Sequence, residues 1–252
     1  MPDLVGTVAS IYLGLVKSVE GTEQVGGELG FGGLLNNRKW VVWAPGREMV
    51  ITAKLTQGVP LLVCLAFRCA QGTEWISFPN GEYLTCGSRQ ADVALSKLLG
   101  LEVRLIRPGR EMCQLKTNFG FDLKPGMGED SSPVQFITTA SFDALGLPLV
   151  QGIRRFRPTF VIDTAGVTGF VLDGWTARQV QVGDSCRLYD RKPTLRCPLP
   201  AQAHGELPEV PQLLRALRRV LPDNETPRMY LGRSAVVLDP GMIQVGDPVY
   251  LL

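Results

Sequence analysis

The sequence lacks the features that mark several large classes of protein. It contains no apolar run of about 18 residues and no charged-then-apolar leader, because a strand-like pattern follows Met1-Pro2-Asp3 almost at once. Its six cysteines form no CxxC pair and keep no regular spacing, so neither a zinc site nor a disulfide framework is indicated. The formal net charge of +2 argues against broad binding of a phosphate backbone. We therefore expect a cytoplasmic protein that binds neither nucleic acid nor a membrane, and any anion site must be local.

Turn-forming residues, by contrast, are abundant. The 28 glycines and 18 prolines are many for a helical protein and ordinary for one built from short strands. Nothing suggests an alternation of strands and helices, so we predict a mainly β fold with a few helices. Strand-like patterns cover 5–16, 39–43, 49–55, 61–67, 101–106, 159–163, 179–182 and 186–189. Helices are predicted at 91–99, from Thr138 to Gly146, and at 213–221 with Arg215, Arg218 and Arg219 facing solvent. The glycine-rich range 21–33 is predicted to be a surface loop or the tip of a hairpin.

The chain is long enough for two domains. Pro108-Gly109 breaks the strand-like pattern, and we predict domains at 1–108 and 109–252, with 124–132 as an alternative boundary.

A short pattern recurs in the second half of the chain. Residues 180–184 and 243–247 each run from alternating apolar residues into Gly-Asp before another strand. Such turns are typical of hairpins, and two of them in a mostly β body point to a barrel.

Cys197 is the first candidate functional residue. It lies in a proline-flanked loop directly after Arg196, and a cationic stretch at 154–157 precedes it in the chain. A thiolate on a stiff loop near arginines suits a soft metal whose organic carrier ends in phosphate. The alternative is a buried, inert cysteine.

Two further groups could take part in chemistry. If Arg155 begins a strand, Arg155 and Arg157 face one way and Phe156 the other, which directs two guanidiniums toward one pocket. The alternative is a pair of solvated arginines at a strand start. His204 is the only imidazole of the chain, so it is the most economical base near neutral pH; the alternative is an idle histidine in a surface loop.

A set of short motifs runs along nearly the whole chain. They are Val16-Lys17-Ser18, Asn37-Arg38-Lys39-Trp40, the strand at 49–54 ending in Lys54, Thr138-Thr139-Ala140-Ser141, Arg155-Phe156-Arg157-Pro158, Asp173-Gly174-Trp175, Arg196-Cys197 and the ending from Pro240-Gly241 to Val249. In order and spacing they resemble the MOSC family, the domain shared with molybdenum-cofactor sulfurases and amidoxime-reducing proteins. The resemblance implies an N-terminal MOSC-associated β-barrel-like region followed by the MOSC domain.

The resemblance to the amidoxime-reducing branch also implies site residues. It makes Cys197 the catalytic residue and the ligand of molybdenum. The residues expected to bind the molybdenum cofactor, a molybdopterin, are Lys17, Ser18, Arg38, Lys54, Thr139, Arg155, Arg157 and Arg196. The chain departs from the family pattern at Thr159, Leu172 and Pro198-Leu199-Pro200, which leaves the substrate class open.

The activity implied by the resemblance is that of a molybdenum-dependent oxidoreductase acting on a small N-oxygenated substrate, such as a hydroxylamine, amidoxime or N-oxide. Two electrons would come from a separate redox protein, because the chain has no flavin, haem or iron–sulfur motif of its own. One alternative is a sulfur-transfer or cofactor-carrier protein that uses Cys197. Another is a metal-free repurposed barrel, which the prolines after Cys197 favour.

Overall fold

The structure is a computed structural model that describes residues 2–108, 116–117, 132–175, 177–221 and 224–252. The chain divides into two compact units. Unit 1 comprises Met1–Tyr12, Glu23–Leu35 and Ser131–Leu252, and unit 2 comprises Leu13–Thr22 and Asn36–Asp130. The expected boundary at 108/109 falls at the edge of the described residues, and the alternative at 124–132 lies almost wholly outside them. The division into 1–108 and 109–252 therefore stays a prediction.

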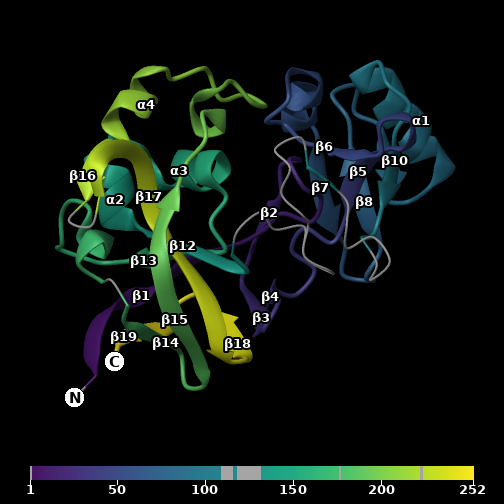
Figure 1. Ribbon diagram of the computed structural model, residues 1–252. Coiled ribbons are helices and arrows are strands. Elements are labelled where there is room, and N and C mark those ends of the chain that lie inside the picture. The colour runs from purple at the N-terminus through teal and green to yellow at the C-terminus, as the bar shows by residue number, and fades with distance from the viewer. Residues whose placement is uncertain (1, 109–115, 118–131, 176, 222–223) are drawn as a thin grey trace. The chain divides into compact units, whose positions relative to one another are not determined.

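Seven strands of unit 1 close into a barrel (Figure 1). In order around the barrel they are β12 (Val134–Thr138), β13 (Phe160–Asp163), β1 (Asp3–Leu13), β19 (Pro248–Leu251), β14 (Gln179–Val182), β15 (Cys186–Leu195) and β17 (Asn224–Asp239). Closure comes from β17, which pairs with β15 on one edge and with β12 on the other. The predicted fold class, mainly β with a few helices and a barrel, is confirmed.

Short helices of unit 1 contribute an apolar core. They are α2 (Thr139–Ala144), α3 (Leu149–Phe156), α4 (Gln212–Ala216) and the 3-10 turns η4 (Val171–Gly174) and η5 (Leu199–Ala201). Phe142 of α2 and Ile153 and Phe156 of α3 are buried in one cluster with Leu231 of β17. The predicted helix start at Thr138 is confirmed, because its Oγ1 accepts a hydrogen bond from the amide of Ser141 as an N-cap.

Three sequence-based expectations for unit 1 are wrong in whole or in part. The range 21–33 is not a surface loop, because it holds β2 (Thr22–Gln24), β3 (Gly26–Gly30) and the start of β4 (Gly33–Leu34). The alternative of a hairpin tip agrees with its second part, where β3 and β4 pair antiparallel. The helix expected at 213–221 stops at Ala216 and gives way to β16 (Arg218–Leu221), which pairs with β17. Of the two Gly-Asp turns, the first joins the β14–β15 hairpin. The second leads from β18 (Gly241–Gln244), which pairs with β3, into β19 of the barrel.

The described residues of unit 2 form two small sheets and one α-helix. The first sheet holds β10 (Arg104–Ile106), β5 (Val41–Ala44), β6 (Met49–Ile51) and β11 (Lys116–Thr117); the second holds β7 (Leu65–Arg68), β8 (Glu74–Ser77) and β9 (Tyr83–Thr85). The helix predicted at 91–99 is confirmed as α1 (Arg89–Leu99), capped by the Ser88 hydroxyl and by Gly100 in the left-handed conformation. The strand expected at 61–67 starts only at Leu65, because the 3-10 turns η2 (Thr56–Val63) occupy its first residues. A further 3-10 turn, η1 (Pro45–Arg47), joins β5 to β6.

No helix in the described ranges has the length and apolar composition needed to cross a bilayer.

Candidate functional site

Cys197 is a partly exposed free thiol between the end of β15 and η5. The alternative of a buried core cysteine therefore does not hold for this residue. It does describe Cys64 and Cys186, where burial raises the thiol pKa to about 12 and about 11, respectively. Unit 1 has two described cysteines, Cys186 and Cys197. Of these, only Cys197 is partly exposed and lies in a loop.

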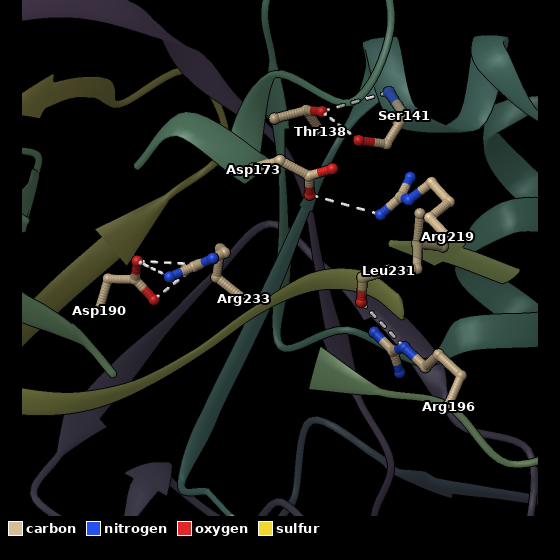
Figure 2. Close-up of polar contacts among 8 residues, drawn as sticks. All are labelled: Thr138, Ser141, Asp173, Asp190, Arg196, Arg219, Leu231 and Arg233. Atoms are coloured by element: carbon tan, nitrogen blue, oxygen red, sulfur yellow. Dashed lines mark hydrogen bonds and ion pairs between the residues drawn. The ribbon is translucent and has the colours of Figure 1, made fainter. Parts of the chain in front are cut away.

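Arg196 fixes the backbone beside this thiol. Its Nε donates to the Leu231 carbonyl at 3.0 Å, as Figure 2 shows, and its Nη1 donates to the Phe156 carbonyl at 3.3 Å. Its guanidinium also lies 5.4 Å from the centre of the Phe156 ring. Because Phe156 directly precedes Arg157, Arg196 joins the segment that carries Cys197 to the segment that carries Arg157.

Arg157 ends α3 in the left-handed conformation, with φ of 49°. Its amide donates to the Ile153 carbonyl at 2.7 Å, and Pro158 prevents the helix from continuing. The expectation that Arg155 begins a strand is therefore wrong. Residues 149–156 form a helix, and the strand starts only at Phe160. Arg155 and Arg157 do not alternate along a strand, and the argument that both face one pocket does not apply.

Arg155 and His204 form hydrogen bonds with the loop that follows Cys197. The Arg155 side chain is 2% exposed, and its guanidinium donates to the carbonyls of Pro200 at 3.0 Å and Pro208 at 2.8 Å. His204 is also 2% exposed, so the expectation of a surface-loop histidine is wrong. Its Nδ1 lies 2.9 Å from the Gln202 carbonyl and its Nε2 lies 3.3 Å from the Arg154 carbonyl.

The chemistry open to His204 follows from this burial. Loss of solvation lowers its pKa below the ordinary value, and the nearby charges of Arg157 and Arg155 lower it further. Both ring nitrogens already face backbone carbonyls. This geometry gives His204 a role in positioning the loop rather than in accepting a proton from a substrate.

Thr139, at the start of α2, is committed to local structure. Its hydroxyl donates to the Asp163 carboxylate at 3.2 Å and accepts from the Thr164 amide at 3.2 Å, so it joins α2 to the end of β13.

In unit 2 the structure brings together four of the residues expected to bind the cofactor. The Lys17 amide donates to the Trp40 carbonyl at 2.9 Å, and the Arg38 amide donates to the Gly14 carbonyl at 2.7 Å, so the two segments run side by side. The Ser18 hydroxyl accepts from the amide of Ala53, the residue before Lys54, at 3.0 Å. Ser18 and Arg38 both have positive φ, at 70° and 48°. Lys17, Ser18, Arg38 and Lys54 therefore occupy one neighbourhood of this unit.

Two charged pairs in unit 1, one buried and one partly exposed, were not predicted from the sequence (Figure 2). Arg233 and Asp190 are almost completely buried and bind each other, and Arg219 reaches Asp173 at 3.4 Å. Arg219 was expected on the solvent face of a helix, which is wrong: its side chain is 16% exposed. A usable signal existed for Asp190 alone, because it follows Cys186 and Leu188 at alternate, core-facing positions of one strand.

Two findings limit where a metal or a cofactor could bind among the described residues. Among the described residues, no three His, Cys, Asp or Glu side chains lie close enough to hold a metal ion together. A metal bound near Cys197 would therefore need most of its ligands from a carrier molecule. A cavity of about 840 Å³ in unit 2, lined by Phe78, Val93 and Leu98 among others, contains none of the expected site residues.

Comparison with known proteins adds independent information. A family model described as the MOSC domain matches residues 124–250 of the 252. The chain is 27% identical to mitochondrial amidoxime-reducing component 1 of Mus musculus, over 98% of this chain and 83% of that protein. The YUAD protein from Bacillus subtilis has a TM-score of 0.47 at 10% identity, covering 100% of this chain and 98% of that one. YiiM from Geobacillus stearothermophilus has a TM-score of 0.33 at 19% identity, covering 50% of this chain and 56% of that one.

Proposed function

Because the chain belongs to the MOSC domain family, we propose that it is a molybdenum-cofactor-dependent oxidoreductase that reduces a small N-oxygenated substrate. Family membership and the amidoxime-reducing relative support a function associated with the molybdenum cofactor. The single observation that carries the finer proposal is the setting of Cys197. It is a partly exposed thiol on a loop whose backbone Arg196, Arg155 and His204 hold in place.

The residues present fit such a cofactor. A pterin dithiolene supplies two sulfur ligands, so molybdenum needs few ligands from the protein. The single thiol of Cys197 matches that need, because the described residues contain no group of three His, Cys, Asp or Glu side chains that could bind a metal by themselves. Cys197 would ligate the metal. Lys17, Ser18, Arg38 and Arg157 would help to hold the pterin and its phosphate, since fixed cations suit an oxyanion.

When bound, the cofactor supplies a metal centre that accepts oxygen from a substrate and exchanges two electrons. The chain's own contribution is positioning. Arg196 ties the Cys197 segment to the Leu231 and Phe156 carbonyls, which limits movement of the thiol. Arg155 donates hydrogen bonds to the carbonyls of Pro200 and Pro208, which follow Cys197 in the sequence. The loop is therefore fixed both before and after the thiol.

The partners follow from what the chain must obtain from outside. The substrate is proposed to be a hydroxylamine, amidoxime or N-oxide, and a separate redox protein is proposed to deliver the two electrons. The name of the mouse relative describes an amidoxime-reducing component and motivates this substrate class. A cytoplasmic location remains a prediction.

Metal and pterin analysis tests the proposal most directly. Protein made in a host that synthesises the cofactor should contain close to one molybdenum per chain, and Cys197→Ser should lose it. Cys69→Ser is the matched control, because Cys69 is another partly exposed free thiol, in unit 2. Wild-type protein without molybdenum or pterin would refute the proposal. Bound cofactor without reduction of any N-oxygenated compound would instead favour a carrier.

A further inference from the structure

The Arg219 side chain has two contacts in unit 1, while part of its hydrogen-bonding capacity is unused among the described residues. Its guanidinium carbon lies over the Phe170 ring, 3.5 Å from the ring centre, and its Nη2 contacts the Asp173 carboxylate at 3.4 Å. Its Nε and Nη1 are buried and have no hydrogen-bond partner among the described residues. These two contacts therefore leave donors of the guanidinium without acceptors among the described residues.

A second buried cation acts on the same carboxylate. Arg233 is 1% exposed, and it binds Asp190 through Nε and Nη2, but its Nη1 also lacks a hydrogen-bond partner in the described part of the chain. Both Arg219 and Arg233 interact electrostatically with Asp173. Figure 2 shows Arg219 reaching toward Asp173 from one side and Arg233 turned toward Asp190 on the other.

Buried guanidinium donors without acceptors are costly, because their water is lost and nothing replaces it. In folded proteins such atoms normally have a partner, and here that partner is not among the described residues. We infer that Arg219, supported by Arg233, forms a binding site for an oxyanion, either a free inorganic ion such as sulfate or the carboxylate of a small organic molecule. This site is separate from the residues proposed above to hold the cofactor.

The charge balance favours an anion over a water molecule once Asp173 is protonated. With both aspartates ionised, the two cations are matched. Burial raises the pKa of Asp173, however, so this carboxylate loses its charge more readily than an exposed one as the pH falls. When Asp173 is neutral, Arg219 and Arg233 face only Asp190. An oxyanion can then accept from the unused donors through charge-assisted hydrogen bonds, which are stronger than those of neutral water.

The site is reachable from solvent at one end. The Asp173 side chain is 30% exposed and the Arg219 side chain is 16% exposed, whereas Arg233 and Asp190 are buried. An ion that enters from solvent would therefore contact Arg219 before Arg233, and the buried Arg233–Asp190 pair would form the inner end of the site.

Two substitutions with opposite expected effects test this site. Binding of sulfate and of acetate to the full-length protein is measured by calorimetry, with chloride at matched ionic strength as the reference. Arg219→Gln should weaken oxyanion binding by about tenfold or more, since a charge-assisted hydrogen bond is lost. Asp173→Asn should strengthen it, because the competing negative charge is removed. Misfolding cannot make a variant bind the oxyanion more tightly. The result for Asp173→Asn therefore tests the site even if Arg219→Gln folds poorly.

Two controls separate this site from other cation sites. Arg218→Gln alters the exposed neighbour of Arg219 in the same strand and should leave binding unchanged. Arg38→Gln alters the proposed cofactor site in unit 2 and should leave the component of binding that is lost in Arg219→Gln unchanged. Loss of binding in Arg38→Gln but not in Arg219→Gln would overturn the inference and place the anion at the cofactor site. Absence of oxyanion-specific binding in wild type and Asp173→Asn alike would mean that only water fills the site. Preference for acetate over sulfate would identify the ligand as an organic carboxylate.

Discussion

Arg233 and Asp190 form an ion pair that is closed to solvent, with side chains 1% and 0% exposed. The Arg233 Nε lies 2.9 Å and 2.8 Å from the two carboxylate oxygens, and its Nη2 lies 2.6 Å from Oδ2. The two residues come from β17 and β15, which are neighbouring strands of the barrel. Burial raises the pKa of Asp190, while the hydrogen bonds and charge of Arg233 oppose that rise. Each charge is therefore tolerated inside the barrel only because the other is present.

This pairing predicts a strong dependence of stability on both partners. Asp190→Asn leaves a buried guanidinium without its counter-charge and should lower the free energy of unfolding by about 3–5 kcal/mol. Adding Arg233→Met should recover much of that loss, because the double variant buries no charge. Urea unfolding followed by circular dichroism measures both.

An exposed pair on the same two strands provides the control. Arg187 and Asp239 also interact across β15 and β17, but their side chains are 48% and 44% exposed. Asp239→Asn should cost less than about 1 kcal/mol, because solvent screens surface pairs. Similar losses for Asp190→Asn and Asp239→Asn would contradict the assignment of a buried, mutually dependent pair.

Local signals in the sequence predicted parts of the fold well. The α1 helix and the start of α2 were found because their caps, Ser88 with Gly100 and Thr138, lie within a few residues of the helix ends they stabilise. The strands that became β14 and β15 were found because alternating burial leaves a pattern of period two. Such features depend on neighbours in sequence.

Features that depend on distant partners were missed. Residues 218–221 form a strand because β17 offers an edge to pair with, and nothing near Arg218 signals that edge. His204 is buried by contacts to the Arg154 carbonyl and to its own loop, which only the folded chain brings together. For Arg155, however, the sequence did hold a clue: apolar Leu149, Ile153 and Phe156 recur with helical spacing.

The candidate site divides in the same way. Family motifs in the sequence pointed to Cys197 and Arg157, and the hydrogen bond from Arg196 to the Phe156 carbonyl shows that their segments meet. No motif pointed to Arg219 or Arg233, because each matters through a partner more than 40 positions away. The assigned roles of Cys197 and Arg157 stay predictions.

His204 should make stability depend on pH. Burial is the main cause that holds the pKa of His204 below the ordinary value of 6.5, and the charges of Arg157 and Arg155 lower this pKa further. The imidazole therefore stays neutral in the folded protein at pH values where it is protonated in the unfolded chain. As the pH falls below about 6.5, proton binding to the unfolded state lowers the free energy of unfolding. His204→Gln should flatten this part of the profile. Unfolding measured between pH 7.5 and pH 5, in about half-unit steps, compares the two slopes. An unchanged slope would show that His204 protonates equally in both states.

Gly152 of α3 should not tolerate a side chain. A Cβ atom at this position would lie 2.6 Å from the Phe142 ring, which packs against Phe156. Alanine favours a helix by about 1 kcal/mol, but overpacking of a buried contact costs about 1–3 kcal/mol. We therefore expect Gly152→Ala to lower the melting temperature. Gly174→Ala, where no atom lies within 4 Å of the added group, should leave it nearly unchanged. Equal melting temperatures for the two variants would mean that α2 and α3 can separate at little cost.

Arg157 should matter for cofactor retention more than for folding. It ends α3 with φ of 49°, a conformation that glycine adopts more easily than any other residue. Arg157→Gly should therefore leave stability unchanged or slightly higher, while loss of the guanidinium weakens retention of the cofactor by about 1.5–3 kcal/mol. Arg157→Ala should weaken retention equally and leave stability close to that of the wild type, because arginine and alanine are strained alike at positive φ. Molybdenum content after extensive dialysis and urea unfolding measure the two effects separately. Arg218→Ala, an exposed arginine, should change neither, and equal loss of molybdenum from Arg218→Ala and Arg157→Gly would show that Arg157 does not bind the cofactor.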